Sequence, residues 1–247
     1  MKKILFTDLD GTLLDFFTYS YEESSEVVDM LLWENVPIVF CSAKTRAEQE
    51  EYRRLLGICD PFIVENGGAI FIPRGYFSFP ITPSKTIGNY LILELGTSYT
   101  KVREMLKRVE KNVGCSIRGF GDMTAREIAE DSGLDLKFAR LAKQREHDET
   151  FKIEGGEEKI GEVLREIERE GFSWTHGGRY YNAMGMGSDK GRATRILAEL
   201  FRRKLGKVEI IGIGDSISDM PMLAEVDVPL LVQKPGGSWE EMNLQNL

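Results

Sequence analysis

Two pairs of aspartates, far apart in the chain, each come after a short apolar run. Asp8 and Asp10 follow the run ILFT near the start, and Asp215 and Asp219 follow the run VEIIGIG near the end. Such runs are typical of strands buried in a parallel sheet, whose ligands bind beyond the carboxyl ends of the strands. Like charges held close together are costly unless a cation or proton relieves them. The pairs therefore suit Mg²⁺, which prefers oxygen ligands, although Asp-x-Asp-Gly is also common in plain turns.

A hydroxyl and an ammonium group add what the carboxylates lack. Ser42 follows the apolar run IVFC, and Lys190 stands beside a glycine at the start of a predicted helix. Carboxylates can hold a cation, while a hydroxyl and an ammonium can hold phosphate oxygens, which is the set that phosphoryl transfer needs. Lys190 alone could instead be a solvated lysine, and Asp219 could merely cap the helix that follows it.

The elements around these residues alternate as they do in an open α/β sheet. A capping box of Thr45 and Glu48 opens one helix, and Asn66-Gly67 between apolar runs predicts a hairpin. Periodicity predicts helices over Glu22–Glu34 and Thr45–Leu56, from the segment after Lys190-Gly191 up to Leu205, and over Met220–Val226. It predicts strands over Ile38–Cys41, Phe62–Val64, Ala69–Ile72, Val208–Ile213 and Val228–Val232. This pattern predicts a parallel-sheet core with helices on both faces.

The middle of the chain follows a different pattern, with more exposed strands and more charged helices. Strands are predicted over Tyr90–Leu95, Thr150–Glu154, Phe172–Thr175 and Tyr180–Met184, the last two around Gly177-Gly178, and helices over Tyr99–Val113, from Thr124, and over Leu134–Lys143 and Glu157–Glu170. We expect an inserted α+β domain over residues 83–187, between two parts of the core at 1–82 and 188–247.

The composition argues against several other classes of protein. The 247 residues carry a net charge of -8 without a long run of one sign, which disfavours nucleic acid as a partner. No apolar stretch could span a bilayer and the apolar start is too short for a signal peptide, so we expect a cytoplasmic protein without a membrane partner. Three cysteines are too few for a disulfide framework or zinc site, and 29% charged residues hint at a thermophilic source.

Four motifs, taken in order, resemble those of the haloacid dehalogenase superfamily of phosphatases. They are Asp8-Leu9-Asp10-Gly11-Thr12, then Ser42, then Lys190, and last Gly214-Asp215-Ser216-x-x-Asp219. The insert resembles the class IIB cap of the Cof-type branch, which implies a Rossmann-like core with a cap domain. Within that branch, segments 42–45, 65–68 and 145–149 are similar to the mannosyl-3-phosphoglycerate phosphatase family. This similarity implies hydrolysis of mannosyl-3-phosphoglycerate to mannosylglycerate, a compatible solute, and phosphate.

The resemblance also implies a role for each motif residue. Asp8 would be the nucleophile that forms an aspartyl-phosphate, and Asp10 would protonate the leaving oxygen and then activate water. Ser42 and Lys190 would hold phosphate oxygens. Mg²⁺ would be held by the Asp8 carboxylate, the Asp10 carbonyl and Asp215, with Asp219 in support. We further expect Mg²⁺ and Lys190 to lower the pKa of Asp8, which must be ionised to attack.

The segments that suggest the substrate supply further candidates. Substrate contacts are expected from Lys44, Asn66, Gly67, Arg145, Glu146 and Glu149. Ordinary alternatives exist, since Asn66-Gly67 could be only a turn and the loop at 145–149 could simply be solvated. Many Cof-type proteins have Arg at the position of Lys44. We expect His147 and His176 to lie on the surface, and Met184 and Met186 to pack at the domain junction.

Other functions also fit part of the sequence. A phosphatase for sucrose-phosphate or another sugar phosphate would keep the chemistry, and a phosphomannomutase would return the phosphate to a sugar. A phospho-receiver module shares an aspartate at a strand end, a hydroxyl, a lysine and Mg²⁺, but it is about half this length. Such a module also has no use for an acid/base two residues after its nucleophile, so we favour an enzyme.

Overall fold

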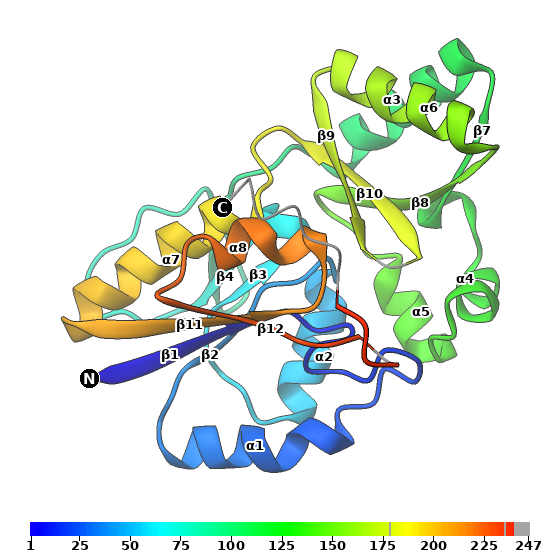
Figure 1. Ribbon diagram of the computed structural model, residues 1–247. Coiled ribbons are helices and arrows are strands. Elements are labelled where there is room, and N and C mark those ends of the chain that lie inside the picture. Colours follow the sequence, from blue (N-terminus) through cyan, green and yellow to red (C-terminus); the bar gives the residue numbers. More distant parts are fainter. Residues whose placement is uncertain (178, 235, 240–247) are drawn as a thin grey trace.

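The computed structural model describes residues 1–177, 179–234 and 236–239 (Figure 1). Gly178 in one predicted turn, Pro235, and residues 240–247 at the end of the predicted core fall outside the described residues. Among the described helices, none combines the length and apolar character needed to cross a membrane.

The larger lobe is built on a parallel sheet, as the sequence predicted. Its four strands lie in the order β12 (Val228–Leu231), β11 (Val208–Gly214), β1 (Lys2–Thr7) and β2 (Ile38–Phe40). In the central strand, Phe6 is paired with Gly212 of β11 on one side and with Val39 of β2 on the other. A single bridge between Cys41 and Ile63 continues this sheet into β3 (Phe62–Val64). The predicted α/β core is therefore confirmed.

An antiparallel extension follows in the order β3, β4 (Ala69–Pro73), β6 (Tyr90–Glu94) and β5 (Lys85–Ile87). The hairpin predicted at Asn66-Gly67 is present and pairs Phe62 with Phe71 across a short 3-10 helix, Glu65–Gly67. Strand β6 pairs along the whole of β4, so residues 85–94 extend the core sheet. The sequence placed the start of the insert at residue 83, whereas strands β5 and β6 pair within the sheet that continues the core. We propose that the inserted lobe begins after β6.

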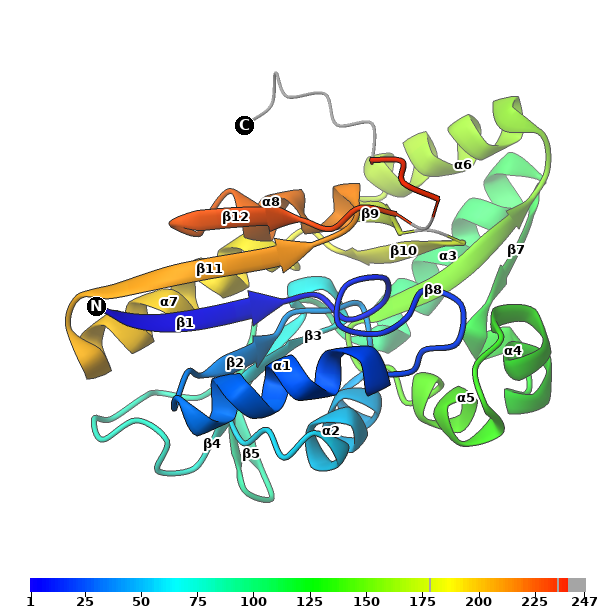
Figure 2. The same cartoon turned by 60° about the horizontal axis from the view of Figure 1, so that its bottom comes forward.

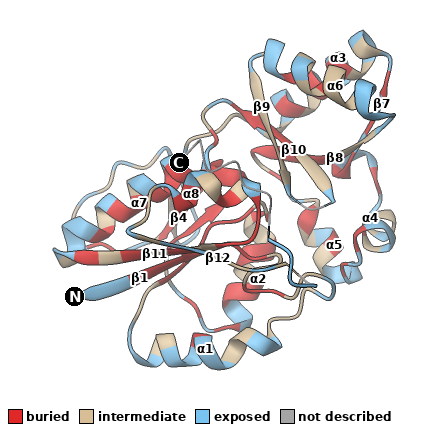
Figure 3. Ribbon diagram, viewed as in Figure 1, coloured by how far each residue is buried: buried red, intermediate tan, exposed pale blue. Residues whose placement is uncertain are grey.

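Helices cover both faces of the parallel sheet (Figures 1 and 2). Successive strand residues point to opposite faces, so Phe6 packs with Phe201 of α7 (Lys190–Leu205), whereas Leu5 packs in the cluster that holds Val28 of α1 (Glu22–Trp33) and Tyr52 of α2 (Arg46–Leu55). The short α8 (Met220–Leu223) joins α7 on the first face. The buried residues in Figure 3 accordingly gather along the strands and on the helix faces turned toward them.

The smaller lobe is an antiparallel sheet with helices on one face and a helical pair at one end. Its strands lie in the order β7 (Ser116–Gly119), β8 (Asp148–Glu154), β10 (Tyr180–Gly185) and β9 (Phe172–Gly177). Helices α3 (Tyr99–Val113) and α6 (Glu157–Arg169) pack on one face around Phe151, and α4 (Ala125–Ser132) and α5 (Leu136–Ala142) form a separate cluster. The capping box predicted at Thr124 is present. The opposite face of the sheet is turned toward the larger lobe.

Candidate active site

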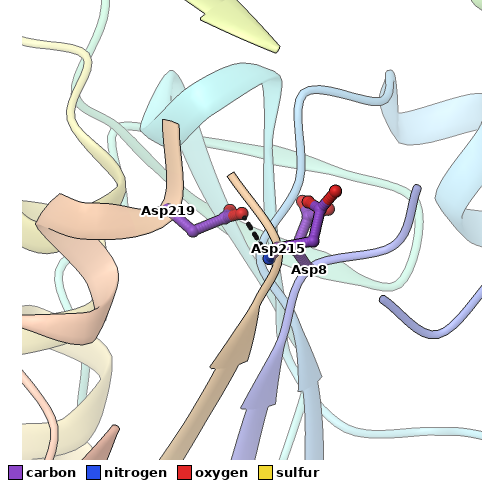
Figure 4. Close-up of side chains that lie close together, drawn as sticks. All are labelled: Asp8, Asp215 and Asp219. Atoms are coloured by element: carbon purple, nitrogen blue, oxygen red, sulfur yellow. Dashed lines mark hydrogen bonds between the residues drawn. The ribbon is translucent and has the colours of Figure 1, made fainter. Parts of the chain in front are cut away.

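Two neighbouring strands place two carboxylates at one edge of the core sheet. Asp8 follows β1 and Asp215 follows β11, and the backbone N–H of Asp8 donates to the carbonyl of Ile213 at 2.9 Å. Figure 4 shows both side chains at the strand ends, with Asp219 from the following turn beside them. All three carboxylates are buried and offer oxygens that lie within 4.8 Å of one another. The sequence predicted this convergence, because parallel strands end at a common edge.

Lys190 lies between two of these carboxylates. It is the first residue of α7, whose preceding Asp189 caps the helix by accepting from the N–H groups of Gly191 and Arg192. The Lys190 Nζ donates to Asp8 Oδ1 at 2.8 Å and to Asp219 Oδ1 at 2.6 Å, and the side chain is buried. Burial opposes its charge, but Asp219 and Asp8 raise the pKa of Lys190 above its usual value. The helix start therefore fixes a permanent positive charge against the predicted nucleophile.

Asp219 is held on both of its oxygens. One binds Lys190, and Oδ2 accepts from the N–H groups of Asp215 and Ser216 and from the Ser216 hydroxyl, each at 3.1 Å. The alternative that Asp219 caps the following helix is wrong, because its side chain makes no cap hydrogen bond to α8; it forms a capping box with Ser216 at the 3-10 turn Ile217–Asp219 instead. The same bonds fix the loop that carries Asp215, so Asp219 both supports Asp215 and adds charge to the cluster.

The charges of this cluster do not balance within the described side chains. Three buried carboxylates face one ammonium, and hard carboxylate oxygens are the donors that Mg²⁺ prefers.

Burial raises the pKa of Asp8 well above its usual value, Asp219 raises it further, and Lys190 offsets only part of the shift. Burial and Asp219 also raise the pKa of Asp215 to about 6. Lys190 lowers the pKa of Asp8, as expected, but burial is the larger effect and the pKa is raised overall. The residues therefore fit a divalent cation.

Gly11 allows the chain to turn immediately after Asp10. Its φ of +78° is a backbone conformation that favours glycine, and a Cβ at this position would lie 2.6 Å from Asp215 Oδ2. The Asp10 side chain lies in different surroundings from that of Asp8. It is 43% exposed, and its Oδ1 lies 2.9 Å from the Nζ of Lys44. The two aspartates of the first motif thus have unequal surroundings.

Lys44 is a buried cation beside Asp10. Its Nζ also lies 3.5 Å from Glu48 and 4.9 Å from the centre of the Tyr19 ring. Burial disfavours the charge, yet Asp10 and Glu48 raise the pKa of Lys44 above its usual value. The side chain is therefore a fixed positive charge within reach of the predicted acid/base.

Ser42 completes a small cavity at the strand ends. The residue is buried, follows β2, and its hydroxyl accepts from the N–H of Lys44 at 3.3 Å. The cavity of about 90 Å³ brings together Asp8, Asp10, Ser42, Asn66, Lys190 and Asp215 from the predictions, with Asn182 of the smaller lobe. We call it the phosphate cavity.

A second cavity of about 90 Å³ adjoins the phosphate cavity, since Asp10, Ala43 and Asn182 line both. We call it the substrate cavity. Lys44, Glu48 and Tyr19 line it from the larger lobe, and Arg145, Thr150, Tyr180 and Leu134 are among the residues that line it from the smaller lobe. Two buried cations, Lys44 and Arg145, therefore face a pocket that lies directly beside the phosphate cavity.

Arg145 is positioned by a buried network between the lobes. Its Nε donates to Asp148 Oδ1 at 2.7 Å, its Nη2 donates to the Ala43 carbonyl at 2.7 Å, and the other Asp148 oxygen accepts from Asn66 Nδ2 at 2.9 Å. The buried Glu65 carboxylate accepts from the backbone N–H groups of the 146–148 loop. Asn66 and Arg145, both predicted from sequence, are thus linked through Asp148.

Other predicted residues lie away from the two cavities' shared wall. Glu146 binds Arg46 Nε at 3.0 Å, and Glu149 is buried in the smaller lobe, where it accepts from the N–H of Gly121 at 3.0 Å. Gly67 has a packing role, because a Cβ there would lie 2.2 Å from the Asp189 carbonyl oxygen. The geometry brings Lys44, Asn66 and Arg145 together and leaves these three apart.

Two expectations about individual residues were wrong. His147 was expected on the surface but is buried between the lobes, where its ring nitrogen Nδ1 lies 3.3 Å from the Thr97 carbonyl. Met186 was expected to pack at the junction but is 71% exposed, while Met184 is buried. His176 is half-buried on β9. Single residues in loops carry no periodic signal, which explains both errors.

Sequence reasoning missed several residues at the cavities. Thr150 and Asn182 are opposite one another on β8 and β10 and both line the substrate cavity, and Glu65 and Asp148 carry the network that holds Arg145. A polar residue amid the buried run of β10 was the available signal for Asn182. Nothing in the sequence indicated the strand register that joins it to Thr150.

Comparison with known proteins agrees with this geometry. Residues 5–234 match the haloacid dehalogenase-like hydrolase family. A glucosyl-3-phosphoglycerate/mannosyl-3-phosphoglycerate phosphatase of Methanococcoides burtonii is 48% identical over 240 residues, which cover 97% of this chain and 88% of the relative. A mannosyl-3-phosphoglycerate phosphatase of Pyrococcus horikoshii is 39% identical over 247 residues, which cover 100% of this chain and 96% of the relative.

Solved structures show the same fold at lower sequence identity. A Thermoplasma acidophilum protein is similar with a TM-score of 0.66 and 21% identity, covering 94% of this chain and 84% of that one. A sugar phosphatase of haloacid dehalogenase subclass IIB is similar with a TM-score of 0.62 and 17% identity, covering 93% and 87%. The resemblance that the four motifs suggested is confirmed, and the chain belongs to the haloacid dehalogenase-like hydrolase family.

Proposed function

We propose that this protein is a Mg²⁺-dependent phosphatase that hydrolyses mannosyl-3-phosphoglycerate, or its glucosyl counterpart, to the glycosylglycerate and phosphate. One observation carries the proposal: a cavity with a nucleophile, a hydroxyl and a buried lysine opens onto a second cavity that holds two further cations. The names of relatives that are 39% and 48% identical support the same substrates. The second cavity suits an anionic group in addition to the phosphate.

The first step is attack of an Asp8 oxygen on phosphorus. The bond from phosphorus to the substrate oxygen breaks as the aspartyl-phosphate forms, and the Asp10 carboxyl group gives its proton to that oxygen. Lys190, 2.8 Å from Asp8, holds the nucleophile in place, and with Ser42 it binds phosphate oxygens. When bound, Mg²⁺ supplies charge neutralisation for the phosphate and the carboxylates of Asp8 and Asp215.

The second step returns Asp8 to its carboxylate form. The Asp10 carboxylate removes a proton from water, the water oxygen bonds to phosphorus, and the bond from phosphorus to Asp8 breaks. Asp10 suits both steps because its side chain is 43% exposed, so water can reach it. It lies 2.9 Å from Lys44 and lines both cavities, so it is placed where the two cavities meet.

The substrate cavity would hold the organic part of the substrate. We propose that Arg145 and Lys44 bind the carboxylate of the glycerate moiety. Arg145 is fixed on one edge by Asp148, and its Nη1 makes no hydrogen bond to any described residue, so that edge can serve the ligand. Charge-assisted pairs of this kind are stronger than neutral hydrogen bonds.

The smaller lobe would act as a cap over the site. We propose that the core comprises the chain before and after the insert, and that the insert supplies substrate contacts from Thr150, Tyr180 and Asn182 while it excludes water. We also retain Asn66 as a substrate contact, because its Oδ1 is buried without a hydrogen-bond partner beside the phosphate cavity.

A phosphate-release assay tests the proposed activity. The full chain with Mg²⁺ is given mannosyl-3-phosphoglycerate, glucosyl-3-phosphoglycerate, mannose 6-phosphate and sucrose 6-phosphate in parallel. We expect the two glycosyl-3-phosphoglycerates to have the highest kcat/KM, because only they carry a carboxylate for Lys44 and Arg145. Faster release from the simple sugar phosphates would overturn the substrate and leave the phosphatase chemistry standing.

A further inference from the structure

The face of the smaller sheet that looks toward the larger lobe carries a pair of polar side chains. Residues alternate between faces along β10, so Ala183 packs among the apolar residues around α3 and α6, while Asn182 on the other side lines the phosphate cavity. On the neighbouring strand β8, Thr150 is directly opposite Asn182. Both side chains are buried, so their hydrogen bonds must be accounted for.

The hydrogen bond between them fixes the Asn182 amide. The Thr150 hydroxyl donates to Asn182 Oδ1 at 2.7 Å, which occupies the acceptor end of the amide. The donor end, Nδ2, makes no hydrogen bond to any residue that the structure describes. Nδ2 is therefore available to donate to a ligand in the cavities that Asn182 lines.

The position of Asn182 indicates where that ligand atom lies. Asn182 lines both the phosphate cavity and the substrate cavity, whereas Lys44 and Arg145 line only the substrate cavity. A group bound at the shared wall is therefore close to the phosphate, and nearer to it than the group that Arg145 holds. In a 3-phosphoglycerate skeleton, the oxygen on the carbon next to the phosphoester carbon has that place.

We propose that Asn182 is a specificity-determining residue whose Nδ2 donates a hydrogen bond to the substrate oxygen on the carbon next to the phosphoester carbon. Thr150 is a positioning residue that acts through Asn182 by holding its amide in the donating orientation. In a glycosyl-3-phosphoglycerate this oxygen is the glycosidic oxygen, which can only accept. The inference rests on the proposed function for the identity of the substrate, and on the two cavities for the position of the contact.

Two small substrates that differ only in this oxygen test the proposal. They are 3-phosphoglycerate and 3-(phosphonooxy)propanoate, and the ratio of their kcat/KM values reports the contact. We expect the full chain with Mg²⁺ to prefer 3-phosphoglycerate by about tenfold, mainly through KM, and Asn182→Leu to bring the ratio close to one. A wild-type ratio close to one, or an unchanged ratio in Asn182→Leu, would overturn the proposal.

The positioning role of Thr150 has its own variants. Thr150→Val removes the hydroxyl donor and lets the amide rotate, so the ratio should fall to about threefold, and Thr150→Ser should restore it. Thr175→Val is the matched control, because Thr175 is opposite Asn182 on β9 and should leave the ratio unchanged. Equal kcat/KM ratios in Thr150→Val, Thr150→Ser and wild type would overturn the positioning role. This test can be made even if Asn182→Leu fails to fold.

The outcome is distinguishable from failure of the proposed function. Turnover of mannosyl-3-phosphoglycerate and glucosyl-3-phosphoglycerate is measured on the same preparations. If neither is hydrolysed while the ratio still depends on Asn182, the proposed substrates fail and the contact stands. If either is hydrolysed and the ratio does not depend on Asn182, the contact fails and the proposed substrates stand.

Discussion

The phosphate cavity and the substrate cavity adjoin, yet they are built in different ways. Asp8 and Asp215 of the phosphate cavity stand at the ends of two paired strands, and Lys190 starts a helix that packs on the same sheet. The substrate cavity instead lies where the two lobes meet, and Arg145 reaches it from a loop anchored to the core by Glu65. The proposed catalytic groups thus stand on regular elements of the core, whereas the proposed substrate contacts come from residues of both lobes.

The largest effect is expected from the nucleophile. Asp8→Asn should lower kcat by about 10⁴-fold or more, because an amide does not attack phosphorus, while the fold is retained. Phosphate release and circular dichroism are the measurements, and Asp29→Asn on the exposed face of α1 is the matched control. Substantial turnover by Asp8→Asn would refute the assignment of Asp8.

Lys190 should show a smaller loss of rate and also a loss of stability. Lys190→Met should lower kcat by about 10²- to 10³-fold, because a fixed charge next to the phosphate is lost. It also leaves Asp8 and Asp219 buried without their ammonium, at a cost of about 3–5 kcal/mol. Urea unfolding without Mg²⁺ measures that cost, with the exposed Lys101→Met as control. Equal free energies of unfolding for Lys190→Met and Lys101→Met would argue against a carboxylate cluster whose buried charge depends on Lys190.

Arg145 tests the substrate cavity in the same way. Arg145→Lys keeps the charge but loses the fork that binds Asp148 and the ligand together, so KM for mannosyl-3-phosphoglycerate should rise by about 10- to 100-fold. The KM for p-nitrophenyl phosphate, which has no carboxylate, should rise far less. Arg46→Lys offers a comparison, since Arg46 pairs with Glu146 away from the shared wall. Equal rises in KM for both substrates would mean that Arg145 supports the phosphate cavity instead of binding the substrate carboxylate.

Glu65 tests the anchoring of the loop. Its buried carboxylate accepts from the N–H groups of Glu146, His147 and Asp148, and an amide in its place would turn a donor toward them. Glu65→Gln should therefore destabilise the protein by about 1–3 kcal/mol in urea unfolding. Glu23→Gln on the exposed start of α1 should change stability little. A neutral Glu65→Gln would mean that the loop is held by other contacts.

The smallest effect concerns pH and Mg²⁺. The pKa of Asp215 is raised to about 6 and that of Asp8 is raised as well, so protons compete with the cation below those values. Mg²⁺ affinity should be highest above pH 7 and should fall as pH drops through 6, by up to about tenfold per pH unit for each proton displaced. Isothermal titration calorimetry across this range is the measurement. An affinity that stays constant from pH 7 to 5 would contradict the raised pKa values.

The same contrast explains what the sequence could predict. Asp8, Ser42 and Asp215 follow apolar strands and Lys190 starts a periodic helix, so local pattern and parallel topology were enough to bring them together. The pairing of Thr150 with Asn182 depends on the register of two strands that lie about thirty residues apart, and no local pattern fixes that register.

Burial decides effects that a pattern of charges cannot show. Lys190 lowers the pKa of Asp8, as the sequence predicted, but the desolvation of the buried carboxylate is the larger effect and raises the pKa overall. A sequence shows which charges are present but not how deeply they are buried.

The central claim is that Asp8 carries the phosphoryl group during turnover and that Asp10 is needed to release it. The most direct test is mass spectrometry of an acid-quenched Asp10→Asn variant after brief reaction with p-nitrophenyl phosphate, whose leaving group needs no acid. We predict one added phosphoryl group on the peptide that contains Asp8, and none when Asp8→Asn is introduced into the same variant. A phosphoryl group on another residue, or nitrophenol release in that variant without any labelled peptide, would contradict the account.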